Sequence, residues 1–195
     1  MRFSAQGYTL VELLVVISIT AIISLVTFVN LGSFREDESL KQSSFALQTN
    51  LRTTQSNATS NRQCNGNSVK YWKAKFIKVG EQYKLETRCE YDYSVGVIPP
   101  GCVKVENQVE CLVSSYSLES SNVIGKISSR HCESTDLSTS PVMIVFAPLS
   151  GRAKFEFTGS SCPPSPQILI QLKNLKTSTN ISTVTVDQGG LIYVE

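Results

Sequence analysis

The stretch Tyr8–Val29, YTLVELLVVISITAIISLVTFV, decides the fold of this 195-residue chain. It has roughly the length of a helix that crosses a bilayer, and its only charged side chain is that of Glu12. A carboxylate in such a segment costs about 2.5–3.5 kcal/mol on insertion scales, so it needs a partner or a role. We therefore expect residues 8–29 to form a membrane-spanning helix in which Glu12 has a function.

The residues around this carboxylate, GYTLVELL from Gly7 to Leu14, resemble the cleavage and methylation signal of type IV prepilins and type II secretion pseudopilins. The resemblance implies that a prepilin peptidase cuts between Gly7 and Tyr8 and methylates the new amine of Tyr8. It also implies that Glu12 assists assembly with other pilin or pseudopilin subunits. The family more often has Phe at the position of Tyr8, so the aromatic ring is kept. The signal covers only the start of the chain.

The chemistry of the signal agrees with this interpretation. Cleavage after Gly7 creates a positive amine about one helical turn from Glu12, and a paired buried charge is tolerated where a lone one is not. A plain signal anchor with one tolerated acid is the alternative. A cleavable secretory signal is disfavoured here, because such a signal has a shorter apolar region and more basic charge before it.

The charge distribution predicts the orientation of the chain. Arg2 lies on the short side of the apolar segment and a large polar region lies on the other, which predicts a cytoplasmic N-terminus and an exported body. The expected location is the inner membrane, crossed once, and then a periplasmic or extracellular filament. A formal net charge of +2 is too small to indicate a nucleic acid or an acidic substrate.

Six cysteines follow the apolar segment, and their even number predicts three disulfides in an oxidising compartment. A two-residue turn at Glu106-Asn107 would place Cys102 opposite Cys111, at a separation that suits a disulfide. For the remaining cysteines, sequence proximity suggests two pairs, Cys64 with Cys89 and Cys132 with Cys162. Reduced core thiols are the alternative. The chain has no close Cys-x-x-Cys pair, which argues against a zinc site. No metal or cofactor is expected.

The helix is expected to continue to about residue 59. Positions spaced alternately by four and three residues form one face of the second half, and Gly32 is the expected place for a bend or local melting. This face is apolar at its centre and small or polar elsewhere, which suits a helix packed on a sheet. The positions are Leu40, Ser44, Leu47, Leu51, Thr54 and Ala58.

Beyond the helix the pattern is typical of strands. A hairpin over 69–79 and 83–91 is expected, with Trp72, Ala74 and Phe76 on the face toward the core. A second hairpin contains the Glu106-Asn107 turn. Strand and loop are not separable over the serine-rich residues 114–140. Further short strands are expected at 142–146, 153–157, 168–172, 183–186 and 191–194.

These elements predict an α+β, pilin-like fold in which the second half of the helix packs on an antiparallel β-sheet. The expected parts are a cleaved leader (1–7), a membrane and filament-core helix half (8–29), an amphipathic helix half (30–60) and a disulfide-containing β-rich domain (61–195). Two segments, 142–151 and 183–194, are similar to the sheet of H-type pseudopilins and FimT-like pilins. This second resemblance favours a minor subunit.

The expected function is structural rather than enzymatic. His131 adjoins Cys132, but neighbours in sequence usually point apart, and no phosphate loop, nucleophile motif or metal cluster occurs. The alternative function is a tip or DNA-uptake pilin that binds DNA or a surface through the basic first hairpin. Its candidate contact residues are Lys70, Tyr71, Lys73 and Lys75, and an ordinary solvated strand face is the simpler interpretation.

Overall fold

The computed structural model describes residues 9–80, 82–93, 96–118, 121–129, 141–157, 165–176 and 181–195, with side chains omitted for 25–34. One long helix, α1 (Leu10–Thr59), precedes ten described strands. The chain divides after Glu38, and Ser39–Glu195 forms a compact unit, here called the body. The body holds the last part of α1 and all the described strands. The α+β class is confirmed, whereas the four-part division of the chain stays a prediction.

The strands of the body form two antiparallel sheets rather than one. The larger has the order β3-β4-β2-β1-β6-β7 and the smaller the order β10-β9-β8-β5. The larger sheet comprises β1 (Tyr71–Val79), β2 (Gln82–Asp92), β3 (Cys102–Val105), β4 (Gln108–Ser117), β6 (Val142–Phe146) and β7 (Ala153–Phe157). The smaller comprises β5 (Asn122–Ser129), β8 (Gln167–Asn174), β9 (Ile181–Asp187) and β10 (Ile192–Val194).

The observed strands match most of the expected ones within a few residues. The first hairpin joins β1 to β2, and the second joins β3 to β4 across the turn at Glu106-Asn107, where Val105 pairs with Gln108. The serine-rich region, in which strand and loop were not separable, contains the end of β4 and the whole of β5.

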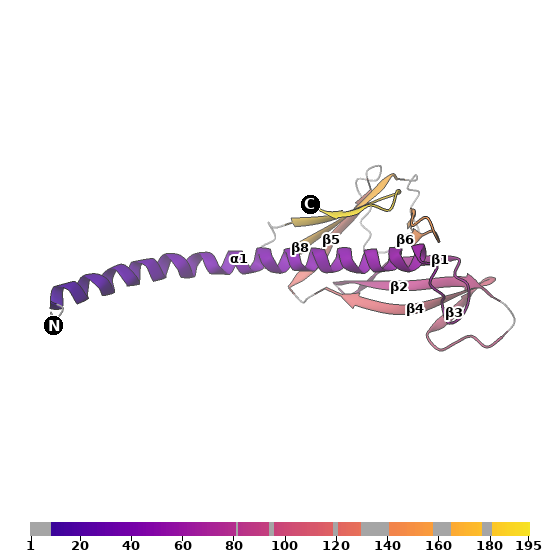
Figure 1. Ribbon diagram of the computed structural model, residues 1–195, viewed down its shortest axis with the longest axis horizontal. Coiled ribbons are helices and arrows are strands. Elements are labelled where there is room, and N and C mark those ends of the chain that lie inside the picture. Colours follow the sequence, from indigo (N-terminus) through magenta and orange to yellow (C-terminus); the bar gives the residue numbers. More distant parts are fainter. Residues whose placement is uncertain are drawn as a thin grey trace, which may run out of the picture. The chain divides into compact units, whose positions relative to one another are not determined.

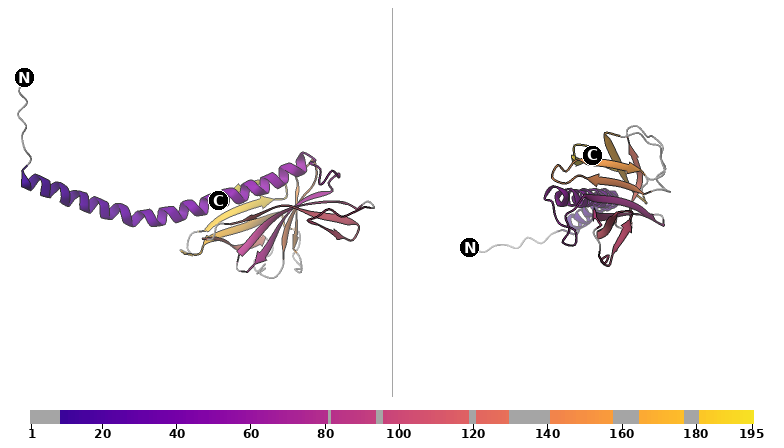
Figure 2. Two further views of the ribbon diagram at one scale, coloured as in Figure 1. Left: turned by 90° about the horizontal axis from the view of Figure 1, so that it is seen from below. Right: turned by 90° about the vertical axis from the view of Figure 1, so that its right-hand side faces the viewer.

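The second half of α1 packs on both sheets, and Figure 1 shows β5 and β8 on one side of it and β2 and β4 on the other. The predicted face is confirmed, since all six of its side chains are buried. Ser44 donates to Ser182 of the smaller sheet at 2.8 Å, and Thr54 shares a 3.0 Å hydrogen bond with Thr87 of the larger one. The views in Figure 2 agree with this arrangement.

Strand alternation fills the core between the sheets and the helix. On β1, Trp72, Ala74 and Phe76 are 0–2% exposed, as the period of two predicts, while the residues between them face outward. The backbone of α1 is helical through Gly32, so local melting at that residue is not seen.

A buried amide cluster attaches the first turns of the body helix to the smaller sheet. Asn122 of β5 is fully buried and donates to the hydroxyls of Ser39 (2.9 Å) and Ser43 (2.8 Å). Asn174 of β8 in turn donates to the amide oxygen of Asn122 at 3.1 Å. Because these polar groups satisfy one another, they are buried without the cost of unpaired donors.

A second polar contact attaches the end of the helix to two loops. The side-chain amide of Gln55 donates to the carbonyl oxygens of Gly151 (3.1 Å) and Gly190 (2.7 Å). Gly190 has φ +91°, and a Cβ built on it would lie 2.4 Å from Gln55 Nε2. The contact therefore requires a residue without a side chain at this position.

Candidate functional site

The helix begins with a reciprocal cap between Thr9 and Glu12. The backbone N–H and the hydroxyl of Thr9 donate to Glu12 Oε2 at 3.1 and 3.2 Å, and the N–H of Glu12 is 3.3 Å from Thr9 Oγ1. This is a capping box, in which two residues three positions apart each accept a hydrogen bond from the backbone N–H of the other. Sequence reasoning missed Thr9, although the Thr-x-x-Glu pattern signals it.

Apolar side chains cover the first turns of α1 on all sides. Ten large ones between Leu10 and Ile23 are 48–81% exposed. The hydroxyls in this segment, such as those of Ser18 and Ser24, donate to carbonyls four residues earlier, at 2.8 and 2.7 Å. Because these donors are satisfied within the helix, the segment suits an apolar surrounding.

Among the described residues, no helix has an apolar stretch that meets the length and hydropathy of a membrane span.

The family model of the prokaryotic N-terminal methylation motif matches residues 2–28, which include the cap and the apolar turns. By this motif the start of the chain is similar to that of type IV pilins and pseudopilins. Pilins of this family are structural filament subunits rather than enzymes, and a prepilin peptidase processes them. The motif implies a membrane-anchored precursor that later joins other pilin subunits. No curated protein and no solved structure matches the chain significantly.

The predicted cleavage site, Gly7 and Tyr8, lies outside the described residues, so it stays a prediction. The same holds for His131 and for the pairing of Cys132 with Cys162.

Two disulfides lie side by side at the end of the larger sheet. Cys64 is bonded to Cys89 and Cys102 to Cys111, the pairs expected from the sequence. Cys111 pairs across strands with both Cys89 and Cys102, so one row of the sheet carries three of the four sulfurs. Cys64 joins this row from the loop that follows α1.

The hairpin residues named as possible DNA contacts do not form a free basic surface. Tyr71, Lys73 and Lys75 lie on the outward face of β1, but Lys73 pairs with Glu90, and its side chain is only 13% exposed. Lys70 lies 3.5 Å from Asp92. No carboxylate of the described residues lies within ion-pair distance of Lys75, the third candidate lysine. DNA binding through this face stays a prediction.

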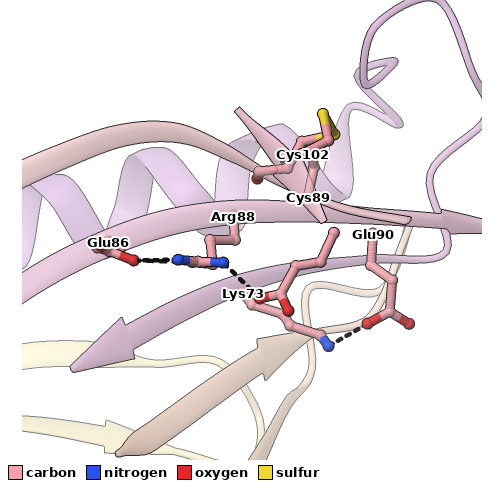
Figure 3. A network of polar contacts seen from close by, with 8 residues as sticks. Lys73, Glu86, Arg88, Cys89, Glu90 and Cys102 are labelled. Atoms are coloured by element: carbon pink, nitrogen blue, oxygen red, sulfur yellow. Dashed lines mark hydrogen bonds and ion pairs between the residues drawn. A yellow bond between two sulfur atoms is a disulfide. The ribbon is translucent and has the colours of Figure 1, made fainter. Parts of the chain in front are cut away.

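Charge pairing continues along β2. Arg88 donates from Nε (2.9 Å) and Nη2 (2.7 Å) to one carboxylate oxygen of Glu86, as Figure 3 shows. Its Nη1 lies 3.7 Å from Oε1 of Glu110. The carboxylates of Glu86 and Glu90 are largely buried, with 7% of each side chain exposed. The outward face of the first hairpin therefore carries a network of paired acidic and basic side chains.

Proposed function

We propose that this chain is a minor pilin or pseudopilin, cut between Gly7 and Tyr8, methylated on Tyr8 and assembled through α1. The observation that supports this most is the exposed apolar start of the helix with Glu12 at its third position. In a filament the apolar surface packs among neighbouring helices, and the carboxylate neutralises the new amine of Tyr8, its own or that of a neighbour. Before assembly, the same segment holds the chain once across the inner membrane, with its N-terminus in the cytoplasm. After assembly, the body faces the periplasm or the cell exterior.

The geometry of the cap supports this role for Glu12. Both hydrogen bonds from Thr9 reach Oε2, and no donor of the described residues reaches Oε1. One carboxylate oxygen therefore holds the start of the helix while the other is open to a cation. A charged acceptor near the helix N-terminus is also favoured by the helix dipole.

The assignment to a minor subunit of the H-type or FimT-like kind rests on the strands at the C-terminus. β9 and β10 form a closing strand-turn-strand around Gly189-Gly190, and their sheet is separate from the one that contains β6 and β7. A closing strand-turn-strand is typical of those subunits in the resemblance noted above.

The test separates the charge of Glu12 from its capping role. Glu12→Gln keeps an oxygen that accepts from the N–H of Thr9 but loses the charge, whereas Thr9→Val loses the hydroxyl and keeps the charge. We expect the first variant to enter sheared filaments at least about tenfold less than the wild type, because a desolvated ion pair is lost, and the second to enter normally. Normal entry of Glu12→Gln would refute the pairing mechanism.

Mass spectrometry of the mature chain tests processing independently. We expect a chain that starts at Tyr8 and is heavier by one methyl group. Gly7→Ala should leave the leader attached, and a wild-type mature protein that still starts at Met1 would contradict the proposal.

A further inference from the structure

A cavity of about 460 Å³ opens on the outward face of the larger sheet, at the end where β1, β6 and β7 meet. Its size lies within the range of small-molecule sites. All of its lining residues belong to the body. They include Tyr71, Lys73, Glu90, Gln108, Arg152 and Glu156.

One wall of the cavity is a continuous chain of polar groups. When the Gln108 amide nitrogen faces Glu90, it donates to Glu90 Oε1 at 2.6 Å, and its oxygen accepts from Lys70 Nζ at 2.6 Å. The other oxygen of Glu90 pairs with Lys73, as Figure 3 shows. This wall is fixed by its own contacts, and it presents both donors and acceptors to the cavity.

The opposite wall carries an available cation. The guanidinium of Arg152 has no carboxylate within ion-pair distance among the residues that the structure describes, and the side chain is exposed. Beside it, Lys154 pairs with Glu156 at 3.0 Å. A free guanidinium presents a planar fork of donors that matches a carboxylate.

The mixture of charges decides which ligand fits. Glu90 and Glu156 would repel a phosphodiester backbone, but they accept hydrogen bonds from hydroxyl groups. A sugar offers many hydroxyls that both donate and accept, and the half-buried ring of Tyr71 gives its apolar face a flat surface. A carboxylate on that sugar would pair with Arg152.

We propose that this cavity binds one acidic sugar unit, a uronic acid, of a polysaccharide. Its carboxylate pairs with Arg152, its hydroxyls bond to Glu90, Gln108 and Glu156, and its ring packs on Tyr71. This goes beyond the proposed filament role and does not depend on it, because the cavity lies within the body alone.

The test is calorimetric titration of the full chain in detergent micelles with trigalacturonate, its uncharged counterpart galactotriose, and a short oligothymidylate. We expect trigalacturonate to bind and Arg152→Gln to weaken it about tenfold or more, as the loss of a charge-assisted hydrogen bond implies. Tyr71→Leu should weaken both sugars. Arg35→Gln, the same change at an exposed arginine outside the body, should leave the affinity for trigalacturonate unchanged.

Three outcomes would overturn the proposal. The first is no heat of binding for trigalacturonate, and the second is an equal loss in Arg152→Gln and Arg35→Gln. The third is tighter binding of oligothymidylate than of trigalacturonate with the same dependence on Arg152, which would make the cavity a phosphate site. Fluorescence of Trp72, the single tryptophan, verifies that each variant is folded.

Discussion

Replacing Gly190 with alanine tests whether the contact with Gln55 holds the end of α1 to the body. The new Cβ would lie 2.4 Å from Gln55 Nε2 and 2.5 Å from the carbonyl oxygen of Gly151. The amide must then leave its two carbonyl acceptors, at a cost of about 1 kcal/mol for each hydrogen bond. The left-handed backbone adds about 1–2 kcal/mol for a residue with a side chain. We expect a total loss of about 3–4 kcal/mol.

Gly80→Ala is the matched control. Gly80 also has a positive φ, +65°, but nothing lies within 4 Å of a Cβ at that position. It should lose only the backbone term, so the two variants should differ by about 2 kcal/mol.

The assay is urea unfolding of the full chain in micelles, followed by the fluorescence of Trp72, which is 2% exposed in the folded body. If Gly190→Ala loses no more stability than Gly80→Ala, the close contact with Gln55 contributes nothing and the reasoning is wrong. The double variant Gln55→Ala, Gly190→Ala should lose less than the sum of its parts, because the crowded amide is gone.

Two further changes probe the polar groups of the body in the same assay. Glu90→Gln should lower the free energy of unfolding by about 2–3 kcal/mol, because it leaves the nearly buried Lys73 without its carboxylate. Lys154→Ala breaks an exposed pair and should cost less than about 1 kcal/mol. Equal losses would show that burial of the pair is unimportant. Asn122→Ala should cost about 2–3 kcal/mol, because the hydroxyl oxygens of Ser39 and Ser43 lose their buried donor. A loss below about 0.5 kcal/mol would show that water replaces the amide.

The sequence predicted those parts of the fold that follow from local spacing. The end of α1, its buried face, the inward face of β1 and the turn at Glu106-Asn107 each depend on periodicity or turn chemistry within a short segment. The pairing of Cys102 with Cys111 followed from that same turn. The exposed apolar start of α1 is likewise a local property of the chain.

The separation into two sheets was not predicted, because it depends on which distant strands pair. β5 was hidden since its buried positions include Asn122 and Ser129, whose polarity resembles that of a loop. The partner of Lys73 was also not predictable: a lysine on an outward face looks solvated until the register places Glu90 diagonally across from it. Lys70, Lys73 and Arg152 come together only through the arrangement of β1, β6 and β7.

The bond between Cys64 and Cys89 has a mechanical consequence. Tension that enters the body from the end of α1 crosses directly to β2 and bypasses the intervening residues, whose sequence separation of 25 corresponds to about 80–90 Å of extended chain. Residues 65–88, which include all of β1 and most of β2, therefore lie outside the stretched path. Even when the strands around it are pulled apart, this segment is not drawn out between the two cysteines.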